Sequence, residues 1–74
     1  MRALTEQSIG FTGVILDVRE DHAEGMANRL RELGFTKGEE LRILGIAPFG
    51  EPVLVELRGA IVALRKKEAA CIKV

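Results

Sequence analysis

The chain has 74 residues, the size of one small domain with a limited core. Eleven Lys and Arg residues balance eleven Asp and Glu residues, whereas a dedicated nucleic-acid-binding domain usually carries a basic excess. A single Cys excludes a disulfide within the chain, and no apolar run approaches the ~20 residues that a membrane helix needs. We therefore expect one domain over residues 1–74, located in the cytoplasm, with no nucleic acid as its partner.

The first predicted strand runs from Phe11 to Val18, where the sequence FTGVILDV is apolar and rich in β-branched residues. In such a strand Val14, Leu16 and Val18 share one face, while Ile15 and Asp17 share the other. This alternation predicts one face that is uniformly apolar, the face of Val14, and a second face of mixed character.

A helix is predicted next, because the apolar residues of DHAEGMANRLRELGF recur at helical spacing over about three turns. These apolar positions are Ala23, Met26, Ala27, Leu30 and Leu33. Asp21 and Glu24 have the spacing of a capping box, which places the start of the helix beside them. Gly34 followed by Phe35 is typical of a Schellman ending, in which glycine takes the left-handed conformation and the next residue packs back.

Further strands and a short helical turn account for the rest of the chain. Alternating residues predict strands in ELRILGIA, PVLVELRG and AIVALR, separated by turns that contain glycine and proline. The segment KKEAA is expected to form one helical turn, and CIKV a closing strand. The sum is a mainly β domain of the α+β class, a small β-barrel of about five strands with one helix inserted after the first strand.

Three stretches, in their order and spacing, resemble the ferrous iron transport protein A family, FeoA: RLRELGFTKGEELRIL, APFGEPVLVELRG and ALRKKEAACIKV. The family pattern has Leu-Gly after a helix, then Ala-Pro-x-Gly-x-Pro, Arg-Gly, Ala-Leu-Arg and a terminal Glu-Ala-x-x-Ile-x-Val. The matching residues are Leu33, Gly34, Phe35, Gly38, Ala47, Pro48, Gly50, Pro52, Arg58, Gly59, Ala63, Leu64, Arg65, Glu68, Ala69, Ile72 and Val74. The resemblance extends from Gly10 to Val74, and residues 1–9 match the pattern poorly.

The resemblance implies an SH3-like barrel with one helix, in agreement with the strands and helix expected from the residues. It also implies a cytoplasmic accessory role in ferrous iron uptake, in contact with FeoB, a membrane transporter that carries a cytoplasmic GTPase region. Such a role is not catalytic and requires no cofactor. The transporter would recruit the chain to the inner face of the membrane, and a second copy of the chain is a further candidate partner.

We expect the partner-binding surface around the loop of residues 48–51. Phe49 is a large apolar residue between a proline and a glycine, so an exposed ring would serve as an anchor for a partner. The alternative is that the ring folds back over the mouth of the barrel, because a small domain needs every apolar group. Leu44, Ile46 and Leu54 fall on faces that a small barrel leaves exposed, and with Phe49 they would form an apolar patch.

The basic row Arg65, Lys66 and Lys67 has two interpretations. It could contact a partner or a nucleic acid, since small barrels bind nucleic acids. It could instead be a solvated turn whose charges keep a sheet edge soluble, and the balanced total charge favours this second interpretation. Ala69, Ile72 and Val74 are expected to seal the barrel as apolar residues.

Few residues of the sequence could hold a metal ion. His22 is the single histidine, and Asp21 and Glu24 lie beside it, but a regular helix cannot aim all three at one point. A weakly bound ferrous ion, held by His22 with Asp21 or Glu24, is therefore the alternative to a protein without metal, and would make the chain a metal-responsive domain. Cys71 is expected to be a small buried residue of the last strand rather than a nucleophile.

Overall fold

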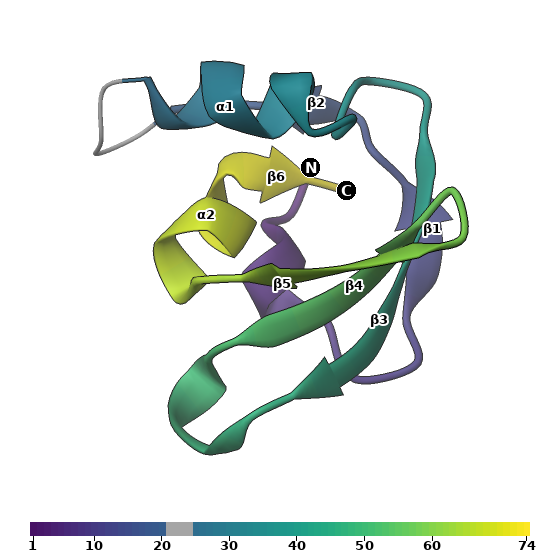
Figure 1. Cartoon of the computed structure of the whole chain (residues 1–74), viewed down its shortest axis with the longest axis vertical. Helices are drawn as coiled ribbons and strands as arrows, with labels where there is room; N and C mark the ends of the chain where they lie inside the picture. Colours follow the sequence, from purple (N-terminus) through teal and green to yellow (C-terminus); the bar gives the residue numbers. More distant parts are fainter. Residues whose placement is uncertain (21–24) are drawn as a thin grey trace.

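The computed structural model describes residues 1–20 and 25–74, and this part of the chain forms two antiparallel sheets with two α-helices (Figure 1). The strands are β1 (Thr12–Val14), β2 (Asp17–Val18), β3 (Glu40–Ile46), β4 (Val53–Leu57), β5 (Ala60–Leu64) and β6 (Ile72–Lys73). The helices are α1 (Met26–Glu32) and α2 (Lys66–Cys71), with single 3-10 turns η1 (Leu4–Glu6) and η2 (Pro48–Gly50). Within the described residues, no helix has the length and apolar character to cross a bilayer.

The larger sheet has the strand order β1-β3-β4-β5, and the smaller sheet pairs β2 with β6. Leu41 and Ile43 of β3 are each 1% exposed, and Val55 of β4 is fully buried, as the predicted alternation requires. In Figure 1, β3, β4 and β5 curl around this core, and α1, α2 and β6 lie together over one end of it. The strands therefore enclose one apolar core beneath a cover of short elements.

The first predicted strand is split into β1 and β2, and its uniformly apolar face is buried at Val18 but not at Val14 or Leu16. The Ile15 N–H donates to the carbonyl oxygen of Glu39 at 2.8 Å, and the Leu16 N–H donates to that of Lys73 at 2.8 Å. The backbone thus changes partner from the residue just before β3 to β6 between adjacent residues. Because the chain turns a corner between two sheets here, Ile15 is fully buried while Val14 and Leu16 are each 45% exposed.

Helix α1 is shorter than predicted and begins after a glycine. Gly25 has φ 85 in the left-handed region, so the helix does not extend back through it. The Met26 N–H donates to Glu20 Oε1 at 2.6 Å, which satisfies one of the free donors at the helix start. The predicted capping pair, Asp21 and Glu24, lies outside the described residues.

The predicted end of α1 is confirmed. Gly34 has φ 107, and its N–H donates to the carbonyl oxygen of Arg31 at 3.0 Å. The Phe35 N–H donates to the carbonyl oxygen of Leu30, also at 3.0 Å, and these two bonds are the pair that defines a Schellman motif. Phe35 and Leu30 are both fully buried, so the turn carries the chain from the helix directly into the core.

The two ends of the chain meet beside α2 and β6 (Figure 1). The Arg2 N–H donates to Val74 at 3.0 Å, and the Val74 N–H donates to Arg2 at 2.8 Å, both to backbone carbonyl oxygens. Ala69 and Ile72 are fully buried, as expected for residues that seal the barrel, and Val74 is partly buried against the core. Leu4 of η1 is 1% exposed. The start of the chain therefore pairs with its end and contributes Leu4 to the core.

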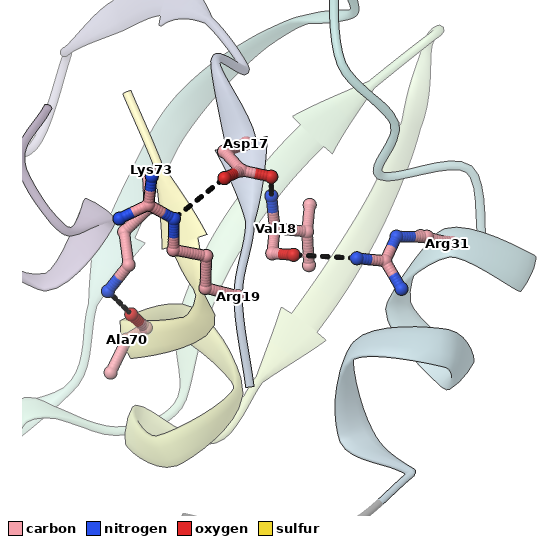
Figure 2. A network of polar contacts seen from close by, with 6 residues as sticks. All are labelled: Asp17, Val18, Arg19, Arg31, Ala70 and Lys73. Atoms are coloured by element: carbon pink, nitrogen blue, oxygen red, sulfur yellow. Dashed lines mark hydrogen bonds and ion pairs between the residues drawn. The ribbon is translucent and has the colours of Figure 1, made fainter. Parts of the chain in front are cut away.

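Polar contacts join α1 to the small sheet (Figure 2). Arg31 Nη2 donates to the carbonyl oxygen of Val18 at 2.7 Å, which holds the helix against β2. Arg19 Nε donates to Asp17 Oδ2 at 2.7 Å, and this bond, with the neighbouring Val18 N–H, holds the pKa of Asp17 below its ordinary value of 3.8. We assign these side chains to the fold, because each bonds within the domain.

Candidate interaction surface

The loop between β3 and β4 presents Phe49 to solvent. The Ala47 N–H donates to the carbonyl oxygen of Pro52 at 3.1 Å, and the Gly50 N–H donates to that of Ala47 at 3.0 Å, which closes the turn around Phe49. Phe49 has φ 73, in the left-handed region, and it is 98% exposed. Of the two alternatives for this ring, the structure therefore has the exposed one, and the ring does not cover the mouth of the barrel.

A second exposed apolar group lies on the outer face of the large sheet, and we call it the outer strip: Leu44, Leu54, Ile61 and Ala63. Leu54 pairs with Ala63 across β4 and β5, and Leu44 precedes the residue of β3 that pairs with Leu54. Leu44 and Leu54 are about as exposed as each other, at 36% and 38%, and Ile61 is 65% exposed. Ile46 was expected among them, but it is only partly exposed and packs against the core.

The sequence analysis missed Ile61 and Ala63. Both lie in β5, where Leu64 is buried, so the period of two places them on the opposite, outward face. The signal was present in the spacing of AIVAL. It could not be used, because every residue of that segment is apolar and no polar residue marks which face meets water.

The basic row Arg65, Lys66 and Lys67 lies at the start of α2, and all three residues are exposed. The Lys66 N–H donates to Glu51 Oε2 at 2.9 Å, which ties the helix start to the loop that carries the exposed ring. The Lys66 side chain runs past Gly50, since a methyl group placed on Gly50 would lie 3.7 Å from Lys66 Cδ and 3.8 Å from its Nζ. The basic row therefore begins directly beside the 48–50 turn.

Behind the basic row lies a hollow of about 370 Å³, lined by Arg29, Arg65, Lys67 and Glu68 together with Met26 and Ala63. Glu68 is 8% exposed, and its Oε1 accepts the Arg65 N–H at 2.8 Å. Its Oε2 lies 3.7 Å from Arg29 Nη1. Three cationic side chains and one carboxylate thus line this hollow. The carboxylate, that of Glu68, already accepts a hydrogen bond within the domain.

The predicted partner-binding residues fall into two neighbouring groups. Leu44 and Leu54 belong to the outer strip, whereas Phe49 and the basic row lie at the 48–50 turn and the start of α2. The groups adjoin at Ala63, which belongs to the strip and also lines the hollow behind the basic row. The structure thus places an apolar sheet face next to a cationic edge.

A second hollow, of about 400 Å³, is lined by charges at the other end of the sheet: Glu39, Glu40, Arg42, Glu56 and Arg58, with Thr12, Leu41 and Gly59. The Arg58 guanidinium donates to Glu39 and holds the pKa of that carboxyl below its ordinary value of 4.5, while Glu39 raises the pKa of Arg58. Arg42 and Glu56 are register partners on adjacent strands. The hydrogen bonds of Arg58 to Glu39 and the opposite charges of Arg42 and Glu56 across the sheet balance this end of the molecule.

The predicted metal ligands His22, Asp21 and Glu24 lie outside the described residues. In residues 1–20 and 25–74, no three His, Cys, Asp or Glu side chains lie close enough together to hold a metal ion. Cys71 is buried as predicted, but it ends α2 rather than lying in the last strand, because extended backbone begins only at Ile72. Its thiol donates to a backbone oxygen of α2 at 3.4 Å, as a small core residue does.

Comparison with known proteins identifies a family that matches this chain. The family described as FeoA domain matches residues 2–74. The crystal structure of Stenotrophomonas maltophilia FeoA complexed with zinc, described as a prokaryotic SH3 domain protein, is 40% identical with a TM-score of 0.86, and the match covers 99% of this chain and 88% of that one. A FeoA-like protein from Clostridium acetobutylicum is 30% identical with a TM-score of 0.85, over 96% of this chain and 80% of that one.

The same fold also occurs inside larger proteins. A manganese-dependent transcriptional repressor in complex with manganese is 26% identical with a TM-score of 0.83, and the match covers 96% of this chain but 34% of the repressor. The small SH3-like barrel expected from the sequence is therefore confirmed, both by the strands and by these neighbours.

Proposed function

The chain belongs to the FeoA family, and on that premise we propose that it is a cytoplasmic, non-catalytic accessory protein of ferrous iron uptake. Its partner in this proposal is a FeoB-type membrane transporter, contacted through the cytoplasmic GTPase region. The Stenotrophomonas maltophilia relative supports this role, because it is described as a candidate activating factor for bacterial ferrous iron transport. Iron is then the cargo of the transporter rather than a resident cofactor of this chain.

The observation that carries the proposal is the outer strip. Leu54 is the central member, because it pairs with Ala63 on one side and lies beside Leu44 on the other. Apolar side chains on neighbouring strands form a contiguous surface, and burying such a surface is favourable by about 25 cal/mol for each Å² removed from water. An apolar sheet face of this kind suits a protein partner that presents its own apolar surface.

A titration tests this assignment. The purified GTPase region of the transporter is titrated with the full chain, and we expect Leu54→Ser to weaken binding roughly tenfold, the effect of losing one anchor residue. Val14→Ser is the matched control, because Val14 is similarly exposed but lies on β1, outside the strip. Absence of binding by the unmodified chain, or an equal loss in both variants, would contradict the proposal.

The metal-responsive alternative rests on His22 with Asp21 or Glu24, outside the described residues. The zinc of the Stenotrophomonas maltophilia structure is a property of that protein. A titration with ferrous iron that follows His22 by NMR tests the alternative for this chain. Unshifted His22 signals at excess metal would remove it.

Two further partners stay predictions. Binding of the basic row to nucleic acid would weaken steeply as salt rises, so an absence of binding at low salt would exclude it. Self-association of the chain would appear as a mass that increases with protein concentration in sedimentation equilibrium.

A further inference from the structure

Phe49 combines two features that oppose the stability of a small domain. A residue other than glycine with φ 73 costs free energy because its Cβ crowds the following carbonyl oxygen. The ring is also 98% exposed, so it gains no burial in return. Strained backbone of this kind often marks a functional position, since the surrounding fold holds the residue in place for another purpose.

The surroundings of the ring are cationic. The Lys66 side chain runs along Gly50, the next residue after Phe49. Arg65, the cap of α2, and Lys67 lie on either side of Lys66 in the chain. Two carboxylates bond to this helix start, because Glu51 accepts the Lys66 N–H and Glu68, farther along the helix, accepts the Arg65 N–H, and the cationic side chains outnumber them. A neutral chain thus carries a local basic edge next to the apolar side chain that is most exposed among residues 1–20 and 25–74.

We propose that the Phe49 loop and the basic row dock on an anionic lipid surface. The ring enters the interface of the bilayer, and Arg65, Lys66 and Lys67 contact headgroup phosphates. Arg29 extends the same cationic surface, because it lines the hollow behind the row. Apolar side chains next to basic ones are the combination that binds peripheral proteins to anionic membranes.

The shape of the loop favours a bilayer over a protein pocket. Phe49 projects from a turn of three residues, η2 (Pro48–Gly50), so it is a narrow convex tip. A protein partner would need a matching pocket, whereas the lipid interface yields to an inserted ring. The outer strip spreads over three strands, so it fits a protein surface better. The two groups would then act together, with lipid and transporter bound at adjoining surfaces.

This binding is expected to be weak and reversible. One ring and three cations are fewer anchoring groups than stable membrane attachment requires. The electrostatic part decays within about 10 Å at 0.1 M salt, so binding should fall as ionic strength rises. Docking on lipid would then concentrate the chain at the membrane without fixing it there.

Co-sedimentation with vesicles tests the proposal and contains no transporter, so its result is independent of the proposed function. The full chain is mixed with phosphatidylcholine vesicles or with equimolar phosphatidylcholine and phosphatidylglycerol vesicles at low salt. We expect several-fold more bound protein on the anionic vesicles. Phe49→Ala and the double variant Lys66→Gln/Lys67→Gln should each reduce the partition coefficient roughly tenfold.

Matched variants separate specific docking from a general loss of charge or apolar surface. Arg2→Gln/Lys37→Gln removes the same charge from exposed positions elsewhere, and Ile9→Ala removes an exposed apolar side chain from another turn. Both should bind as the unmodified chain does, and circular dichroism confirms that each variant folds. Absence of binding to anionic vesicles, or equal losses in the controls, would overturn the proposal. So would a Phe49→Ala variant that binds vesicles normally but loses affinity for the GTPase region, because the ring would then belong to a protein contact.

Discussion

The two turns that connect β3 to β4 and β4 to β5 both hold a residue other than glycine at positive φ. In the β4–β5 turn this residue is Arg58 with φ 52, and in the β3–β4 loop it is Phe49 with φ 73. Leu57 pairs with Ala60, so two residues connect these strands, and Gly59 also has positive φ. Positive φ at both central residues is what the right-handed twist of the strands requires in such a short hairpin.

The difference lies in what surrounds each residue. Arg58 is held by hairpin geometry and by its hydrogen bonds to Glu39, so the fold itself explains its conformation. Phe49 lies in a longer loop that could use glycine, and its ring is almost completely exposed. The same backbone conformation is thus architectural in one turn and unexplained by packing in the other, which points to a role outside the domain for Phe49.

The largest effect is expected at the short hairpin. Gly59→Val should lower the free energy of unfolding by about 2 kcal/mol, because a β-branched residue is strained at φ 79. Urea denaturation monitored by circular dichroism measures the change. Ala60→Val, one residue later in an exposed strand position, is the control and should be close to neutral. Equal losses in both variants would show that the turn does not require positive φ.

The next effect has the opposite sign. Phe49→Gly should raise the free energy of unfolding by about 1 kcal/mol, since relief of the strained φ exceeds the entropy that glycine adds to the unfolded chain. The same denaturation experiment measures it, with Phe49→Ala as the control that keeps the strain. A loss of stability in the glycine variant would mean that the ring packs on the domain in solution, and the contrast between the turns would fail.

A smaller change is expected for the equivalent variant of the hairpin. Arg58→Gly relieves the same kind of strain, but it removes the exposed ion pair with Glu39, which offsets part of the gain. The net change in the free energy of unfolding should therefore be smaller than that of Phe49→Gly. A gain as large as that of Phe49→Gly would show that the ion pair contributes nothing.

The smallest effect is a pH dependence confined to the hairpin. The folded pKa of Glu39 is lowered by Arg58, so its contribution to stability is fully present above the ordinary value of 4.5 and is lost as pH falls through the folded pKa. The stability of Arg58→Gly relative to the unmodified chain should therefore rise on acidification. Denaturation midpoints measured across this range test it, and Phe49→Gly should keep its gain unchanged. A pH-independent difference for Arg58→Gly would contradict the pairing.

Much of the fold follows from local patterns. The alternation in β3 and β4 predicted which residues are buried, and the Gly34–Phe35 pair predicted how α1 ends, because both signals depend on neighbouring residues alone. The family resemblance came from the same local motifs, and the match over residues 2–74 confirms it. Of the site, the sequence indicated Phe49 and the basic row as candidates, since residue type and turn chemistry are visible in one dimension.

Tertiary structure decided the rest. The split between β1 and β2 arises because Ile15 and Leu16 bond to different strands, and no local period records a change of partner. Whether Phe49 points outward, and whether Ile61 faces water, depends on which surfaces of the barrel meet the core. An apolar sequence determines that a residue can be buried, but only the long-range pairing of strands determines which face is turned inward and which is left for a partner.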